Sequence, residues 1–332
     1  MTTLPRALAG LLLLVAGAAS AIETTPIGSA PLAGAPVTNS IAKPVAAMPT
    51  DHDVPLSWTQ LDAMPLPKPG QRLAYGISPA QFGELRMPDR KRFGKGPFPV
   101  IVMIHGGCWL ADYDYAYFTR LAAWFTDQGV ATWTIEYRRL GDKGGGWPGT
   151  FLDVATATDT LRVIAKNEPI DLKRVYAAGH SAGGQLALWL ATRSRLPNDS
   201  ELATTSPLPI HGVLGLAAIT DLAEYRVGPA DSCHASVDKL MGGTPQTVAR
   251  RYAEGSPRAR LPLKVPQVFV QGERDPIVSA ASVRAYADAA KAAGDKVTLL
   301  AMPTAGHFEA SVPHPASVAA LKLALQTLLK AP

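Results

Sequence analysis

The stretch that most constrains the fold runs from Arg174 to Ala191 and reads RVYAAGHSAGGQLALWLA. An apolar, strand-forming run leads into Gly179-His180-Ser181-Ala182-Gly183, and an Ala- and Leu-rich helical pattern follows at once. Ser181 is then expected at the apex of a sharp strand–turn–helix, with glycines where a Cβ would collide with neighbouring backbone. A Gly- and Ser-rich turn can show the same letters by chance. The strand before it and the helix after it favour a nucleophilic serine.

Apolar strand candidates alternate with helical patterns from residue 72 onward. The expected strands are 72–77, 99–105, 130–137, 174–178, 212–219, 267–271 and 297–302. The expected helices are 115–128, 150–167, 182–193, 280–293 and 316–329. This order predicts an α/β fold, a mostly parallel central sheet with helices on both faces, whose strands end at one shared edge. Residues 221–262 break the alternation with Gly and Pro, which predicts a small cap-like insertion over that edge.

The N-terminus has the features of a signal peptide. Arg6 precedes the apolar run Leu8–Val15, and Ala19-Ser20-Ala21 offers a small-residue cleavage site. We therefore expect residues 1–21 to direct export to the periplasm or the medium, with no stable membrane insertion after cleavage. An uncleaved N-terminal anchor is the alternative. Residues 22–70 form an expected Pro- and Ala-rich linker, ordering near 56–66, and 71–332 form the expected catalytic domain.

Charge and composition argue against a nucleic-acid partner. The formal net charge is +5, but the positive residues are scattered and form no dense basic stripe. The 47% hydrophobic and 18% charged residues are typical of a globular protein. The sequence carries no signal for an oligomeric state.

The chain holds two cysteines, Cys108 and Cys233. Outside the cytosol, two lone thiols tend to pair, so a Cys108–Cys233 disulfide is a reasonable hypothesis. Two buried free thiols are the alternative.

A serine nucleophile needs a base, and His307 is the preferred one of seven histidines. It lies in a short loop after the last expected strand, at the edge where Ser181 is expected. His314 is the main competitor. Three others suit other roles: His211 precedes a strand, His180 flanks the nucleophile and is expected to turn away, and His105 is expected to hold a loop by hydrogen bonding. A further one, His52, falls in the linker.

The base needs a carboxylate to orient it, and Asp275 follows the expected strand 267–271 directly. Pro276 stiffens the loop that carries it. Asp221 follows the preceding strand and is a rival, with a structural turn or cap as its other reading. Glu273 is a weaker rival. The order along the chain is then Ser, Asp, His.

A serine nucleophile also needs N–H donors for the oxyanion that forms when it attacks a carbonyl group. The strand 99–105 runs into His105-Gly106-Gly107-Cys108-Trp109, and we favour the N–H groups of Gly107 and Cys108. The N–H of Ala182, at the start of the helix after Ser181, adds a third donor. Three nearby aromatic residues suggest an aromatic-lined site or plain packing: Trp109, Tyr113 and Trp147.

With these pieces in this order, the chain resembles the α/β-hydrolase superfamily. It is most similar to the esterase and lipase branch with a His-Gly-Gly-x-Trp loop, which includes feruloyl-esterase-like enzymes and kynurenine formamidases. The resemblance covers residue 73 to the C-terminus, and Cys108 departs from the third glycine or aromatic residue of many relatives. It implies the α/β-hydrolase fold and a serine mechanism without a metal or cofactor.

The sequence therefore predicts an exported serine hydrolase that cleaves a small carboxylic ester through an acyl-enzyme. Arylformamidase and peptidase activities use the same residues and are the nearest alternatives. A binding protein on a hydrolase scaffold is disfavoured, because such proteins usually lack part of the site and here every part is present.

Overall fold

The computed structural model describes residues 54–330 and contains one eight-stranded sheet. Its strand order is β1-β2-β4-β3-β5-β6-β7-β8, with β1, β2 and β4 paired antiparallel and every other pair parallel. The strands are β1 (Gln71–Ala74), β2 (Phe82–Arg86), β3 (Phe98–Ile104), β4 (Ala131–Ile135), β5 (Ile170–His180), β6 (Val213–Leu216), β7 (Gln267–Gly272) and β8 (Val297–Met302). The predicted mostly parallel sheet is confirmed.

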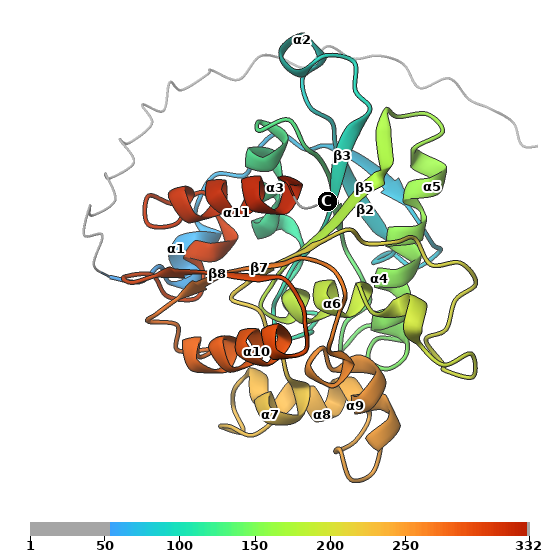
Figure 1. Cartoon of the computed structure of the whole chain (residues 1–332), viewed down its shortest axis with the longest axis vertical. Helices are drawn as coiled ribbons and strands as arrows, with labels where there is room; N and C mark the ends of the chain where they lie inside the picture. The colour runs from blue at the N-terminus through green and yellow to red at the C-terminus, as the bar shows by residue number, and fades with distance from the viewer. Residues whose placement is uncertain (1–53, 331–332) are drawn as a thin grey trace, which may run out of the picture. The chain divides into compact units, whose positions relative to one another are not determined.

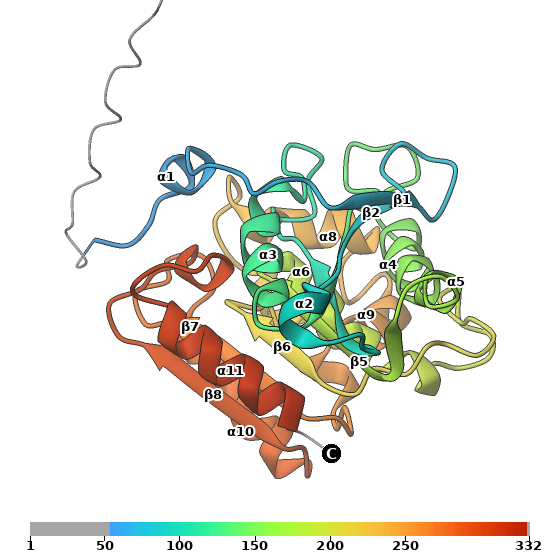
Figure 2. The same cartoon turned by 90° about the horizontal axis from the view of Figure 1, so that it is seen from above.

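Helices cover both faces of the sheet. Figure 1 shows α3 and α11 on one side of the strands and α6 and α10 on the other. The α-helices are α1 (Trp58–Asp62), α2 (Arg90–Phe93), α3 (Thr119–Thr126), α4 (Gly149–Asp159), α5 (Leu161–Ile164), α6 (Ala182–Leu190), α7 (Leu222–Tyr225), α8 (Ser236–Met241), α9 (Ala249–Gly255), α10 (Ala280–Ala292) and α11 (Val318–Lys330). Figure 2 shows the same layers from above, with α11 lying along β7 and β8.

Strand β3 shows why the sheet is covered twice. Its side chains alternate between two cores: Val100 and Val102 join the core on the α6 side, and Ile101 and Met103 join the core on the α3 side. All four are fully buried. Successive side chains of a strand point to opposite faces, so a strand that is apolar at every position must be buried on both.

Several elements differ from the expectation: α1 and α2 were not among the expected helices, β5 begins four residues earlier and ends two residues later than expected, and β6 is shorter. Strand β2 was missed because its sequence, FGELR, is short and mixes polar with apolar residues. The expected helix 150–167 is divided into α4 and α5 at Thr160. Thr156, Thr158 and Thr160 each donate a side-chain hydrogen bond to the carbonyl four residues earlier, a pattern that bends helices.

The segment 221–262 lies between β6 and β7 and forms the short helices α7, α8 and α9, together with two 3₁₀ turns (Figure 1). Its place along the chain and its short helices match the expected insertion.

The order expected near residues 56–66 is present, and it means that the linker boundary expected at residue 70 is too late. Helix α1 lies within 54–70, begins with a capping box between Ser57 and Gln60, and buries Leu61 completely. Leu56 is also buried in the core. These apolar contacts outweigh the Pro-rich composition, so this part of the expected linker belongs to the catalytic domain. The predicted signal peptide and residues 22–53 lie outside the described residues.

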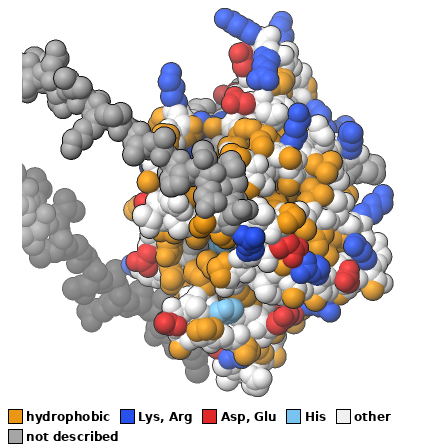
Figure 3. Space-filling model, turned by 90° about the vertical axis from the view of Figure 1, so that its left-hand side faces the viewer, with side chains coloured by type: hydrophobic (Ala, Val, Ile, Leu, Met, Phe, Trp, Pro, Cys, Tyr) orange, Lys and Arg blue, Asp and Glu red, His pale blue; other side chains and the backbone are white. Residues whose placement is uncertain are grey.

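Charges of both signs are mixed with hydrophobic side chains on the face shown in Figure 3, which is the left-hand side of Figure 1. Within residues 54–330, no helix combines the length and the apolar character that crossing a membrane would require.

Candidate active site

Ser181 occupies the turn between β5 and α6, as predicted, and its backbone is strained. Its φ of 55° and ψ of −119° lie in a region that residues with a side chain rarely adopt. A Cβ on Gly179 would lie 2.0 Å from the carbonyl oxygen of Gly183, and one on Gly183 would lie 2.1 Å from that of Ile104. Both glycines are therefore required for the close packing that holds the turn.

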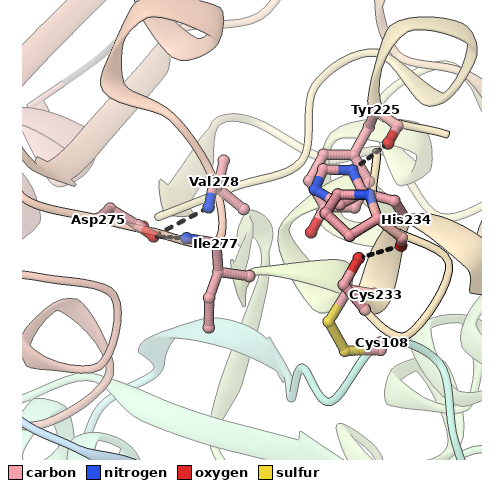
Figure 4. The surroundings of a disulfide bond; sticks show 9 residues. Cys108, Tyr225, Cys233, His234, Asp275, Ile277 and Val278 are labelled. Atoms are coloured by element: carbon pink, nitrogen blue, oxygen red, sulfur yellow. Dashed lines mark hydrogen bonds between the residues drawn. A yellow bond between two sulfur atoms is a disulfide. The ribbon is translucent and has the colours of Figure 1, made fainter. Parts of the chain in front are cut away.

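His307 and Asp275 meet at the edge where β7 and β8 end. The Nδ1 atom of His307 lies 2.7 Å from Oδ2 of Asp275. The other carboxylate oxygen, Oδ1, accepts the N–H groups of Ile277 at 2.8 Å and Val278 at 2.9 Å (Figure 4). The side-chain amide of Gln271 donates to Oδ2 at 3.2 Å. These donors fix the carboxylate, and the carboxylate fixes the imidazole.

Ser181 and His307 line one cavity of about 110 Å³. Both are almost fully buried, at 3% and 4% exposure. Because Nδ1 of His307 faces Asp275, its Nε2 atom is the nitrogen left for a proton from the serine. The structure thus brings together the three residues that the sequence singled out, from three separate loops.

The two rival carboxylates have other partners. Asp221 accepts the N–H groups of Ala223 and Glu224 and caps α7, which is the structural role that the sequence analysis gave as its alternative. Glu273 forms an ion pair with Arg284 at 2.6 Å on the surface. Neither lies among the residues of the cavity that contains Ser181.

The rival histidines also have other partners. Nδ1 of His314 accepts the N–H of Ala316, and His211 contacts the backbone of Val175. His180 does line the cavity, but both of its ring nitrogens are hydrogen-bonded away from the serine. His52 lies outside the described residues.

The predicted oxyanion loop follows β3 with three successive positive φ angles, at Gly107 (103°), Cys108 (54°) and Trp109 (57°). Gly107 and Cys108 line the cavity with Ser181. Within residues 54–330, no acceptor binds either of their N–H groups, whereas the N–H of Gly106 donates to Tyr117 at 2.7 Å. Gly107 and Cys108 therefore keep the free donors that an oxyanion needs.

Ala182 is the third predicted donor. It directly follows Ser181 and is the first residue of α6. An N–H at this position has no partner within its own helix and lies at the positive end of the helix dipole. It suits a negative charge that develops beside Ser181.

A buried polar cluster anchors the start of the oxyanion loop. Nε2 of His105 lies 2.9 Å from Oε1 of Glu136, and the hydroxyl of Tyr137 donates to the carbonyl of His105. Burial alone would raise the pKa of Glu136, but its contacts with His105 and Arg139 outweigh burial and hold that pKa below its ordinary value. His105 thus has the loop-holding role that the sequence suggested.

A disulfide joins Cys108 to Cys233, with their Cα atoms 5.0 Å apart (Figure 4). This is the pairing proposed from the sequence, and it links the oxyanion loop to the insertion. The next residue, His234, binds the carbonyl of Tyr225 through Nδ1 and packs on the Tyr225 ring at 4.3 Å. The wall of the cavity on this side is therefore fixed to the insertion.

The sequence reasoning missed most of the aromatic wall. Trp58 packs edge-on against Tyr113 at 5.1 Å and Tyr117 at 5.4 Å, and these three line the cavity with Phe308. Tyr113 was expected there. The other two expected aromatics do not line the cavity: Trp109 is fully buried in the core, and Trp147 packs on Phe151.

Two side chains fasten the segment that carries Trp58. Glu309 accepts the N–H of Leu56 at 2.6 Å with one carboxylate oxygen and the N–H of Gly306 at 2.9 Å with the other. Arg120 donates to the carbonyls of Asp62 and Pro65. Ser57 directly before Trp58 could have indicated the start of a short helix, but the surrounding prolines suggested a linker instead.

The sheet order, the strained serine turn and the hydrogen-bonded histidine define the α/β-hydrolase fold. The family model named BD-FAE matches residues 87–289, which is more than half of the chain. The chain belongs to the BD-FAE family and is an esterase-like hydrolase.

Solved structures share this fold. A truncated carbohydrate esterase from gut microbiota matches with a TM-score of 0.66 and 18% identity, over 80% of this chain and 98% of that one. Est2, a thermophilic esterase from Thermogutta terrifontis, matches with a TM-score of 0.63 and 20% identity, over 79% of this chain and 92% of that one. A bifunctional GH43-CE protein of Bacteroides eggerthii matches with a TM-score of 0.64 and 21% identity, over 77% of this chain and 37% of that one. A comparison with curated proteins finds no match.

Proposed function

We propose that this protein is an exported serine hydrolase that cleaves carboxylic esters through an acyl-enzyme. The observation that carries the proposal is the 2.7 Å contact between His307 and Asp275 beside a strained, buried Ser181. This arrangement supplies a nucleophile, a base and a group that orients the base.

In the first half-reaction, Ser181 Oγ forms a bond to the ester carbonyl carbon, and Nε2 of His307 takes the serine proton. The carbonyl oxygen becomes an oxyanion that the N–H groups of Gly107, Cys108 and Ala182 can stabilise. The ester C–O bond then breaks, His307 gives its proton to the leaving alkoxide, and the alcohol departs. Asp275 stabilises the imidazolium that exists between these two steps.

In the second half-reaction, water replaces the alcohol. His307 takes a proton from the water as the oxygen attacks the acyl-enzyme, and it returns that proton to Ser181 as the acid leaves. The acyl–serine bond breaks as the acid leaves, and the serine hydroxyl is regenerated. His307 thus carries each transferred proton in both half-reactions.

The small cavity supports a short acyl group. Its volume of about 110 Å³ is well below the range of about 300 to 1,000 Å³ typical of pockets for drug-sized ligands. Aromatic rings and the disulfide close it on several sides. One of the neighbours is named a carbohydrate esterase, so an acetylated sugar belongs in the substrate panel beside simple esters.

Export is supported by the apolar N-terminal run with its Ala19-Ser20-Ala21 site and by a disulfide, which forms and persists in oxidising compartments. Expression of the full chain followed by N-terminal sequencing tests this proposal. We expect a mature protein that begins at Ile22 outside the cytoplasm. A cytoplasmic chain that retains its first 21 residues would contradict it.

A fluorophosphonate probe tests the serine mechanism. We expect labelling and p-nitrophenyl acetate hydrolysis in the parent protein and the loss of both in Ser181→Ala. The control Ser200→Ala removes another buried serine, whose hydroxyl donates to Glu254, and should keep both. Full ester hydrolysis by Ser181→Ala would overturn the proposal. Faster turnover of an N-formyl-arylamine than of the ester would favour an arylformamidase.

A further inference from the structure

Two buried polar side chains beside Ser181 have no part in the proposed reaction. The hydroxyl of Tyr117 accepts the N–H of Gly106 at 2.7 Å and lies 2.8 Å from Nδ1 of His180. Nε2 of His180 lies 3.1 Å from the carbonyl oxygen of His307. These contacts form a continuous bridge from the backbone of the oxyanion loop to the backbone of the residue that supplies the base.

The chemistry of these groups fixes the direction of each hydrogen bond. A carbonyl oxygen can only accept, so Nε2 of His180 carries the proton and donates to His307. Nδ1 of the neutral ring is then an acceptor and receives the hydroxyl proton of Tyr117. The same hydroxyl oxygen accepts from Gly106, so every donor and acceptor of the bridge is satisfied.

Both bridging side chains stay neutral near neutral pH. Burial lowers the pKa of the His180 ring well below 6.5, and the nearby His307 and His105 rings lower it further. Burial also raises the pKa of the Tyr117 hydroxyl far above its ordinary value. The rings of Phe118 and Phe308, which carry no charge, and the ring of His307 also pack around the His180 ring.

We propose that Tyr117 and His180 are positioning residues that hold the oxyanion loop and the base-bearing loop at one fixed separation across the nucleophile. The inference rests on the proposed function. It assigns a specific role to the residue between Gly179 and Ser181, because His180 spans from the nucleophile turn to both loops. Neither residue forms or breaks a bond in the proposed mechanism. The ring of His180 packs on the ring of His307 with 4.6 Å between ring centres, and both residues act through the groups that react.

The geometry around Gly106 explains why the separation matters. A Cβ on Gly106 would lie 2.7 Å from the carbonyl oxygen of His180 and 3.0 Å from Cβ of Ser181. The loop backbone thus already packs directly against the nucleophile. A shift of about 1 Å in such a constellation can cost about 100-fold in rate.

The disulfide and the Glu309 carboxylate each fasten only one of these two loops, and in the described part of the chain the ring of Trp58 packs beside both without a hydrogen bond to either. The disulfide fastens the oxyanion loop to the insertion, and Glu309 fastens the base-bearing loop to the N-terminal segment. The Tyr117–His180 bridge joins the oxyanion loop to the base-bearing loop by hydrogen bonds. Because these two loops supply the oxyanion donors and the base, loss of the bridge should weaken transition-state stabilisation more than substrate binding.

Tyr117→Phe tests the bridge, because it keeps the ring in the aromatic wall and removes the shared hydroxyl. We expect kcat for p-nitrophenyl acetate to fall about 10- to 100-fold with KM changed less than about threefold. Tyr286→Phe is the matched control: Tyr286 is equally buried, and its hydroxyl donates to Gln267 at 3.0 Å. It should lower thermal stability to a similar extent and leave kcat unchanged.

A double-mutant cycle adds a readout that general destabilisation would not reproduce. His180→Gln keeps a side-chain amide for the carbonyl of His307 but loses Nδ1, so it breaks the link to Tyr117. Because both changes break one bridge, the double variant should be no slower than the slower single variant. Multiplying losses, or equal kcat in Tyr117→Phe and Tyr286→Phe, would overturn the inference. Activity that survives Ser181→Ala would instead overturn the proposed function.

Discussion

Replacing Cys108 and Cys233 together by serine should destabilise the protein and slow the reaction. The disulfide closes a sequence separation of 125 residues between the oxyanion loop and the insertion. Serine is close in size to cysteine, so the double variant removes the cross-link with little change in packing. The free chain gains conformational freedom in the unfolded state, and the loop loses its tie to the insertion in the folded state.

The size of the stability effect follows from the loop length. For a loop of 125 residues, the chain-entropy relation gives about 5 kcal/mol as an upper figure, and measured effects are typically about 2 to 4 kcal/mol. At a urea dependence of about 3 kcal/mol per M, a loss of about 3 kcal/mol lowers the unfolding midpoint by about 1 M. Turnover should also fall, by about tenfold, because Gly107 and Cys108 become freer to leave the positions that suit an oxyanion.

Urea unfolding of the parent and the double variant, each with and without reductant, measures both effects. Reductant should lower the midpoint of the parent to that of the double variant and leave the variant unchanged. Alkylation of the denatured parent should modify no thiol before reduction and two afterwards. Equal midpoints for the parent and the variant, together with two thiols that react without reductant, would refute the reasoning.

Two further predictions address the aromatic wall and the buried histidine. Trp58→Ala should raise kcat/KM for butanoate relative to acetate esters by about tenfold, because the two extra methylenes gain about 1.6 kcal/mol of burial; Trp124→Ala, at another half-buried tryptophan outside the cavity, should not. An unchanged chain-length profile would argue against Trp58 as a wall. His180 should make the folded state less stable as pH falls below about 6.5, since the unfolded ring binds a proton that the buried ring refuses, by up to about 1.4 kcal/mol per pH unit. Urea unfolding at several pH values between 6.5 and 5 gives the free energy of unfolding as a function of pH. This free energy should fall less steeply with pH in His180→Gln than in the parent, and equal pH dependence would contradict a lowered pKa for His180.

The fold was predictable because the strands are buried on both faces and therefore read as continuous apolar runs. Strand β8 has the predicted bounds, Val297–Met302, and β3 differs by one residue at each end. Strand β2 was missed because Gly83 and Glu84 interrupt its apolar pattern. Its position is set by antiparallel pairing with β1 and β4, which no local pattern reveals.

The chemistry-bearing side chains were predictable for a topological reason. Parallel strands end at one edge, so a residue that directly follows a strand can be placed there from the sequence. This reasoning found Ser181, Asp275 and His307. It could not find Trp58, because that residue precedes the sheet, and long-range contacts, among them those of Glu309 and Arg120, hold its segment beside the cavity. The role of His180 was missed because its partners, Tyr117 and His307, are far away along the chain.

The strained backbone of the site explains why so many ties converge on it. Ser181, Cys108 and Trp109 all have positive φ angles, and each such residue costs about 1 to 3 kcal/mol. This conformation persists only where the surroundings determine it fully. Trp109 is fully buried and donates to Gln185 of α6, and Cys108 is fixed by the disulfide.

The strain is therefore overcome by folding, before any substrate arrives. The N–H groups of Gly107 and Cys108 are already unpaired in a loop that cannot easily collapse onto another acceptor. Donors fixed in this way need no rearrangement when negative charge develops, and this is the condition under which they lower a barrier most. Trp109→Ala and Trp109→Gly leave nearly the same cavity in the core, but only glycine releases the strain. Trp109→Gly should therefore keep the three side chains of the site and have the lower kcat of the two, because its loop would no longer hold the donors free. A lower kcat for Trp109→Gly than for Trp109→Ala at constant fluorophosphonate labelling stoichiometry would show this, whereas equal kcat would mean that the strain has no catalytic role.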